Sequence, residues 1–223
     1  QKEGNTREAI FYYKMAIKVN PDFPEVYNNL GFFLLEEGNT NEAIYNLRKA
    51  VTLDPDFTVA YWNLGNALMA DEKTKEAISH YKTAIELDPD SAQGHFTLGN
   101  ALMAEKENKE AILHYRTALK LKPGWADAYF NTGVALQKEG NTSEAIARYK
   151  TAIELDPEFA QAYNNLGNLL SETGNTREAI SNLRKAVNLV PEFALAYWNL
   201  GNALSAERKT EEAISHYKMA IKI

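Results

Sequence analysis

One interval of 34 residues governs the whole chain. Proline, glycine and alanine each recur at this spacing, and the three series keep a fixed offset from one another. The recurring residues are Pro21, Pro55, Pro89, Pro123, Pro157 and Pro191; Gly31, Gly65, Gly99, Gly133, Gly167 and Gly201; and Ala9, Ala43, Ala77, Ala111, Ala145, Ala179 and Ala213. Such a period predicts a stack of similar supersecondary units, each packed on its neighbours, in place of one globular core.

The spacing of apolar residues within 24–57 predicts two helices. Their apolar stripes follow the helical period and comprise Tyr27, Leu30, Gly31 and Leu34, then Ala43, Ile44, Leu47, Ala50 and Val51. Gly38 suits the left-handed position that ends the first helix, and Asn39 with Glu42 predicts a capping pair for the second. Pro55 ends the second helix because proline cannot continue it. The small glycine and alanine in the two stripes allow the helices to approach closely.

This unit resembles the tetratricopeptide repeat, in which Trp-x2-Leu-Gly-x2-Tyr is followed by Ala-x3-Phe, Ala and Pro. The Trp slot holds Tyr in each unit except 92–125, where His95 stands. The resemblance covers the entire chain and implies an all-α fold, a right-handed α-α superhelix whose first helices line the inner surface. We expect one solenoid domain over 1–223. Its repeats are a partial unit at 1–23, full units at 24–57, 58–91, 92–125, 126–159 and 160–193, and a truncated unit at 194–223.

Three units depart from the pattern at their internal turn. Glu72, Lys106 and Arg208 replace the turn glycine there, and we expect a cost in stability if that residue has positive φ. A longer period is also present, because residues 1–87 align with 137–223 without a gap. This offset of four repeats suggests a duplication within a longer array. We therefore expect two apolar ends that favour end-to-end self-association.

Asparagine recurs on the side of the first helices that faces away from the apolar stripe. The candidate groove residues stand two before the motif glycine at Asn29, Asn63, Asn131, Asn165 and Asn199, and one after it at Asn66, Asn100, Asn168 and Asn202. Asparagine is a middling-to-poor helix former, so its repeated use within helices indicates a function. A primary amide both donates and accepts hydrogen bonds, and a row of amides can therefore pair with the backbone of an extended peptide. The alternative is that these amides bond neighbouring repeats or water.

The first of these rows resembles the asparagine ladder in the tetratricopeptide arm of protein O-GlcNAc transferases. That resemblance implies that the row holds an extended peptide, with an interruption at Thr97. Aromatic side chains precede the row at Trp62, Phe96, Phe130 and Trp198. They could form apolar pockets that select the peptide, or they could pack between adjacent first helices.

The second helices carry two further polar slots. One holds a basic residue in every unit, and each of these helices begins with glutamate, an arrangement that complements the helix dipole. The other holds His80, His114 and His216, which lie a repeat apart without an acid or thiol cluster beside them, so we expect no metal. The sequence has neither a phosphate-binding glycine loop nor a hydrolytic serine motif. We therefore expect no cofactor, no catalytic residue and no enzyme.

Charge and composition narrow the partners. A net charge of −6 argues against nucleic acid, and no apolar run is long enough to cross a membrane. Cysteine is absent, which fits a reducing compartment, and we expect a cytoplasmic protein. Co-chaperone members of the resembled family clamp a terminal carboxylate with Lys and Arg on the groove helices. The corresponding slots here hold no cation, which argues against such a carboxylate clamp. Their residues are Asn28, Trp62, Phe96, Phe130, Asn164 and Trp198.

The sequence therefore predicts a protein–protein interaction scaffold whose partner is a protein or peptide in extended conformation. Nucleic acid and membranes are not expected partners, whereas end-to-end self-association is. Two alternatives stay open at this point. The chain could be the substrate-recruiting arm of a glycosyltransferase whose catalytic domain lies outside these residues, or it could be a self-assembling structural rod.

Overall fold

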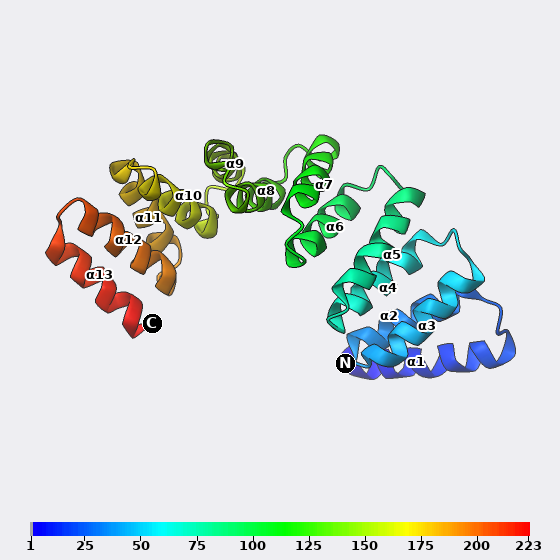
Figure 1. The fold of residues 1–223 in the computed structure, drawn as a ribbon. Coiled ribbons are helices and arrows are strands. Elements are labelled where there is room, and N and C mark those ends of the chain that lie inside the picture. Colours follow the sequence, from blue (N-terminus) through cyan, green and yellow to red (C-terminus); the bar gives the residue numbers. More distant parts are fainter. Residues whose placement is uncertain (1) are drawn as a thin grey trace. The chain divides into compact units, whose positions relative to one another are not determined.

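The computed structural model describes residues 2–223, with side chains from Thr6 onward, and this part of the chain forms helices without strands (Figure 1). The helices are α1 (Lys2–Val19), α2 (Pro24–Glu36), α3 (Thr40–Leu53), α4 (Thr58–Ala70), α5 (Thr74–Leu87), α6 (Ala92–Ala104), α7 (Asn108–Leu121), α8 (Ala126–Lys138), α9 (Thr142–Leu155), α10 (Ala160–Glu172), α11 (Thr176–Leu189), α12 (Ala194–Ala206) and α13 (Thr210–Lys222). None of these helices is long and apolar enough to span a lipid bilayer.

The helices divide into two compact units, the first ending at Leu121 and the second beginning at Lys122. In the first unit each helix from α1 to α7 packs on the next, and α2 also touches α4. In the second unit the same holds from α8 to α13, and α10 also touches α12. Helix therefore follows helix in antiparallel pairs that stack on one another within each unit (Figure 1). The predicted fold class is confirmed: the chain is an all-α solenoid of helical repeats.

The motif glycine sets how closely the two helices of a pair approach. A Cβ atom added at Gly65 would lie 2.3 Å from Cε1 of Tyr81 on the next helix. At Gly31 it would lie 2.5 Å from Cγ of Leu47. Both distances are far below van der Waals contact, so only glycine fits this slot without movement of the neighbour. The prediction that small residues bring the helices together is confirmed.

The turn between the two helices of a pair uses the left-handed region of the backbone. Positive φ angles occur at Gly38 (78°), Gly140 (77°), Gly174 (84°), Glu72 (58°), Lys106 (65°) and Arg208 (61°). Glu72, Lys106 and Arg208 thus have the positive φ at which the sequence predicts a loss of stability. An L-residue adopts this backbone conformation only at a cost in free energy.

The prediction that Asn39 and Glu42 cap α3 is wrong, because the side-chain capping hydrogen bond does not form. Asn39 stands at the N-cap position, but its side chain makes no capping hydrogen bond. Glu42 instead pairs with Lys14 of α1, with 2.8 Å between Nζ and Oε1. A side-chain cap does form at α6, where Oγ of Ser91 accepts from the backbone N–H of Gly94 at 3.1 Å. The glutamate of the first turn therefore serves contacts between repeats.

Candidate functional site

A hollow of about 490 Å³ lies on the first helices of the second unit. Its lining comes from α8 (Val134, Gln137 and Lys138), α10 (Asn164, Asn165 and Asn168) and α12 (Leu195 and Asn199). Every lining residue belongs to a first helix of a repeat, and the second helices contribute none. The hollow thus brings together three of the predicted groove residues, Asn165, Asn168 and Asn199.

Three of the asparagines in this hollow are joined by hydrogen bonds. Nδ2 of Asn199 donates to Oδ1 of Asn164 at 2.9 Å, and Nδ2 of Asn164 donates to Oδ1 of Asn165 at 3.1 Å. Asn164 is only 2% exposed, and a buried amide of this kind must be hydrogen-bonded. It therefore serves as the link between two amides of neighbouring repeats that face the hollow.

The first unit contains the same arrangement 136 residues earlier in the sequence. Nδ2 of Asn63 donates to Oδ1 of Asn28 at 2.8 Å, and Nδ2 of Asn28 donates to Oδ1 of Asn29 at 3.2 Å. Asn28 is buried as well. Four residues of the predicted ladder, together with Asn28 and Asn164, thus make two amide triads, one in each unit. Asn131 is half-buried on α8, and Thr97 accepts from Gln93 at 3.4 Å.

The triad of the second unit continues into a longer chain of hydrogen bonds. The hydroxyl of Tyr149 donates to Oε1 of Gln137 at 2.8 Å. Burial raises the pKa of Tyr149 to about 12, and a hydrogen bond from Asn165 acts in the opposite direction. The Tyr149 hydroxyl hydrogen already goes to Gln137, so the phenol oxygen accepts this bond and the Asn165 amide donates it. We call this series of hydrogen-bonded side chains the amide relay; its members are Asn199, Asn164, Asn165, Tyr149 and Gln137.

The second predicted row of asparagines has a role in the packing of each repeat. Oδ1 of Asn66 accepts the hydroxyl hydrogen of Tyr81 at 2.7 Å. The same bond joins Asn100 to Tyr115 at 2.7 Å and Asn202 to Tyr217 at 2.9 Å. Where the second helix has leucine at the tyrosine slot, Asn168 donates to Glu172 at 2.8 Å instead. Three of the four asparagines in this row therefore accept a hydrogen bond from the tyrosine of their own repeat.

The aromatic residues beside the ladder pack on the phenols of their own repeats. Ring centroids lie 5.3 Å apart for Trp62 and Tyr81, 5.8 Å for Phe96 and Tyr115, 5.8 Å for Phe130 and Tyr149, and 5.0 Å for Trp198 and Tyr217. Trp62 also reaches the next first helix, where a Cβ atom at Gly94 would lie 2.5 Å from its ring. Trp198 is 48% exposed, so much of its ring surface faces solvent.

Sequence reasoning missed several residues of the hollow. Gln137, Lys138 and Leu195 occupy slots with no common residue type, Val134 replaces the asparagine of the second row, and the linking role of Asn164 was not predicted. One signal was available for Gln137. Its repeat has Val134 where other phenol-bearing repeats have asparagine, so Tyr149 needs another acceptor for its hydrogen.

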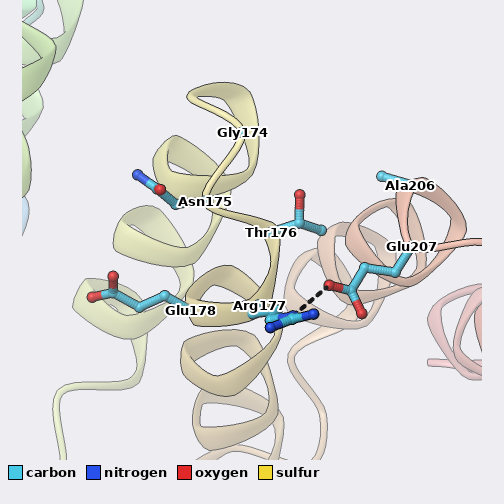
Figure 2. Close-up of a pocket in the computed structure, with 7 residues that line it drawn as sticks. All are labelled: Gly174, Asn175, Thr176, Arg177, Glu178, Ala206 and Glu207. Atoms are coloured by element: carbon cyan, nitrogen blue, oxygen red, sulfur yellow. Dashed lines mark ion pairs between the residues drawn. The ribbon is translucent and has the colours of Figure 1, made fainter.

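A second hollow, of about 520 Å³, lies where the turn between α10 and α11 faces the end of α12 (Figure 2). Gly174, Asn175, Thr176, Arg177 and Glu178 line one side, and Ala206 and Glu207 the other. The single ion pair drawn across it joins Arg177 and Glu207 at 3.9 Å. Arg177 is almost fully exposed, so this pair is weak. None of the predicted groove residues lies here.

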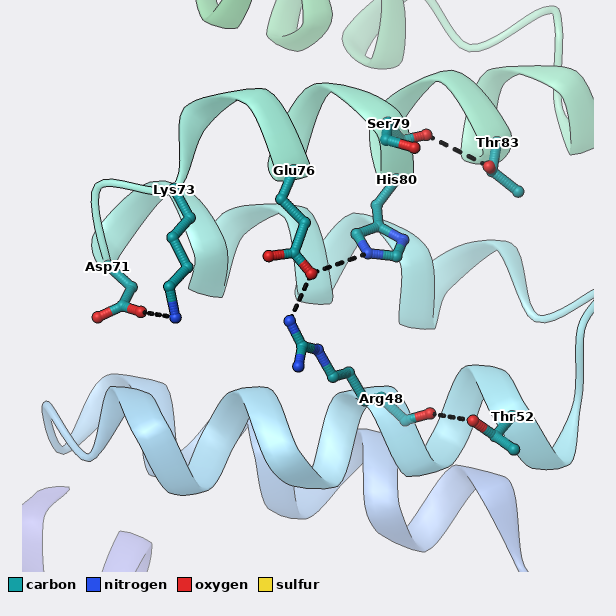
Figure 3. A network of polar contacts seen from close by, with 8 residues as sticks. All are labelled: Arg48, Thr52, Asp71, Lys73, Glu76, Ser79, His80 and Thr83. Carbon is teal, nitrogen blue, oxygen red and sulfur yellow. Dashed lines mark hydrogen bonds and ion pairs between the residues drawn. The ribbon is translucent and has the colours of Figure 1, made fainter.

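The basic slot of the second helices forms ion pairs between repeats, 28 residues apart. The pairs are Lys14–Glu42, Lys82–Glu110 and Lys150–Glu178 at 2.8 Å, Arg184–Glu212 at 2.9 Å, and Arg48–Glu76 (Figure 3). The helix dipole is therefore not the only partner of these bases. Burial lowers the pKa of His80 beside this stripe, and the charge of Glu76 opposes that shift. Each exposed pair contributes less than about 1 kcal/mol.

The histidines include one close pair. Nδ1 of His95 lies 3.0 Å from Nδ1 of His114, and its Nε2 lies 3.0 Å from the carbonyl oxygen of Pro89. A carbonyl only accepts, so when both rings are neutral His95 donates from Nε2 and accepts at Nδ1 from His114. No group of three or more potential ligands suited to a metal ion occurs in the described part of the chain.

Comparison with known families identifies one kind of repeat along the chain. A family described as TPR repeat matches residues 33–72, 65–106, 99–140, 138–174 and 167–207. Two families described as tetratricopeptide repeat match residues 12–45 and 194–223. A search of curated protein sequences finds no match.

Solved structures of similar fold include YrrB, described as a TPR protein with an unusual peptide-binding site. It is 26% identical with a TM-score of 0.74, over 88% of this chain and 97% of that chain. MamA is 26% identical with a TM-score of 0.68, over 71% and 93% of the two chains. The C-terminal part of a TPR repeat-containing protein from Cytophaga hutchinsonii shares the fold at 15% identity, with a TM-score of 0.81 over 99% and 91%.

Proposed function

This chain belongs to the tetratricopeptide-repeat family, and on that premise we propose that it is an interaction scaffold that binds an extended peptide in the hollow of the second unit. The family and its structural neighbours support the role of a protein-interaction scaffold. The peptide and its place on the first helices are the finer part of the proposal.

The amide lining of the hollow is the observation that carries this proposal. Each residue of an extended peptide offers one N–H donor and one C=O acceptor. The Asn165 and Asn199 amides lie on neighbouring first helices and can offer both kinds of partner. Asn164 bonds to both of them, which holds them in place before a ligand arrives. Preorganisation of this kind lowers the entropy cost of binding.

The same chemistry limits the strength of binding. Each hydrogen bond to the peptide contributes about 0.5–1.5 kcal/mol net, so a few amides together supply only several kcal/mol. Ordering of a flexible peptide removes part of that gain. Val134 and Leu195 add apolar contact at the two sides of the hollow. We therefore expect dissociation constants of about micromolar or weaker.

Selection from a random twelve-residue peptide display library tests the proposal. The wild-type chain and the N165A/N199A variant are used as separate baits, and the enriched peptides are then synthesised with a fluorescent label. We expect these peptides to bind the wild-type chain about tenfold more tightly than the variant, because two amide partners are lost.

The matched control is N188A, which removes an exposed asparagine from the second helix α11. Circular dichroism establishes that all variants keep their helices. Equal affinities for the wild-type chain and a folded N165A/N199A variant would exclude the hollow as the binding site. Failure to enrich any peptide on the wild-type chain would remove the proposed function altogether.

A further inference from the structure

The amide relay ends in a hydrogen-bond donor at the α8 side of the hollow. Oε1 of Gln137 accepts the Tyr149 hydrogen at 2.8 Å, which turns the amide oxygen towards the phenol. Nε2 is then the polar group of Gln137 that remains for a ligand, and an amide nitrogen only donates. The buried phenol therefore decides which half of the Gln137 amide a ligand meets.

A positive charge lines the same hollow as this donor. Lys138 is the last residue of α8 and lines the same hollow. It is the only lysine or arginine on the six first helices, α2, α4, α6, α8, α10 and α12. The Lys138 ammonium makes no ion pair with any residue that the structure describes. An ammonium and an amide nitrogen that line the same hollow both seek acceptors, and a carboxylate satisfies either.

The opposite side of the hollow has a different character. Asn199 uses its nitrogen to donate to Asn164, which turns its Oδ1 away from that contact. Leu195 lies on the same helix and is an exposed apolar residue. The α12 side therefore suits a backbone N–H and an apolar side chain, whereas the α8 side suits an anion. One acidic group contacts the lining of the hollow between these two sides. Glu172 accepts a hydrogen bond from Nδ2 of Asn168, so this amide nitrogen is already engaged.

We propose that Gln137 and Lys138 form a subsite for the carboxylate of an aspartate or glutamate side chain in the bound peptide. This inference rests on the proposed function, because it specifies which peptides the hollow of the second unit selects. Tyr149 is a positioning residue in this subsite, since it holds Gln137 as a donor without reaching the ligand. The peptide places its acidic residue at α8 and an apolar residue at α12.

Library selection with charge variants tests the subsite. Displayed peptides are fused at their C-terminus, so a carboxylate can come only from a side chain. Peptides selected on the wild-type chain should have one position enriched in Asp or Glu. Peptides selected on K138E should lose this enrichment and have Lys or Arg at that position. Peptides without acidic enrichment, or the same peptides from both baits, would overturn the subsite while leaving peptide binding intact.

Synthetic peptides then measure the discrimination directly. A selected peptide and its Glu-to-Gln counterpart, both amidated at the C-terminus, are titrated against each variant. The wild-type chain should prefer the acidic form by about two- to fivefold, as expected of a charge pair open to solvent. K138Q should lose most of this preference, because only the Gln137 amide then favours the carboxylate, whereas K185Q, which removes an exposed lysine from α11, should keep it. An unchanged preference in K138Q contradicts the proposal.

The role of Tyr149 has its own readout in the same titration. Y149F removes the hydroxyl that holds Gln137, so the ratio of affinities for the acidic and neutral peptides should fall. A merely structural role would weaken the binding of both peptides by the same factor and leave their ratio unchanged. If neither peptide binds the wild-type chain, the proposed function itself fails, and that outcome is distinct from equal binding of the two.

Discussion

Substitution of Gly65 by alanine tests whether close helix approach stabilises the repeat. A Cβ atom at this position would lie 2.3 Å from Cε1 and 2.6 Å from Cδ1 of Tyr81. The phenol ring has little freedom to yield. It is buried, its hydroxyl donates to Asn66 at 2.7 Å, and its ring centroid lies 5.3 Å from that of Trp62. The added methyl group must therefore push α4 and α5 apart.

Two opposing effects set the size of the change. Overpacking of a core costs about 1–3 kcal/mol, and alanine inside a helix recovers about 1 kcal/mol of propensity relative to glycine. The free energy of unfolding of G65A should therefore fall by about 1 kcal/mol. In a chain of this length such a loss lowers Tm by about 2–4 °C.

Urea unfolding followed by circular dichroism measures the change, and the chain supplies two controls. G124A adds a methyl group where no atom lies within 4 Å, so its stability should not fall. G201A meets Cε1 of Tyr217 at 2.4 Å, but that phenol is only half-buried and can move, so its loss should be smaller than that of G65A. A G65A variant as stable as the wild-type chain would refute the claim that glycine spaces these helices.

Two further predictions concern the turns and the histidines. K106G should raise the free energy of unfolding by up to about 1 kcal/mol, measured by urea unfolding, because glycine adopts the positive φ of this turn without strain. Burial and then the charge of His95 lower the pKa of His114 from 6.5, against the opposing charge of Glu110 and with a further lowering by Lys82. The unfolded chain therefore takes up that proton first, and stability should fall as the pH drops below about 6.5. H95Y should reduce this loss of stability, measured as the difference in Tm between pH 7.5 and pH 5.5. A difference as large as that of the wild-type chain would contradict the effect of His95 on the pKa of His114.

The fold could be predicted from the sequence because its determinants repeat. The 34-residue period places the motif glycine opposite a large side chain in each pair, and the structure has that contact at Gly31 and Gly65. The positive φ of Glu72 follows from its alignment with Gly38. The capping prediction at Asn39 failed for the opposite reason. A first-turn glutamate can cap its own helix or reach the helix of an earlier repeat. Which of the two it does depends on the distance between repeats, and the pattern within one repeat does not give that distance.

The candidate site was predictable only where it shares the repeat. Asn165, Asn168 and Asn199 could be identified because asparagine recurs in their slots. Gln137 and Lys138 could not be identified from a recurring residue, because the residue type in their slots varies from unit to unit. The role of Gln137 depends on its contact with Tyr149, and that of Lys138 on the absence of lysine and arginine from the other first helices.

The exceptions to the repeat also follow a rule of their own. Four units have an aromatic residue before the ladder slot and tyrosine on the second helix, whereas the units of Asn28 and Asn164 have leucine on the second helix. Replacement of an aromatic ring by asparagine leaves space on the first helix and brings a buried amide that must be bonded. That amide finds its partners in the flanking ladder residues, which creates the two triads. The hollow of the second unit thus lies where asparagine replaces an aromatic ring, and its amides are held in place by hydrogen bonds of the fold itself.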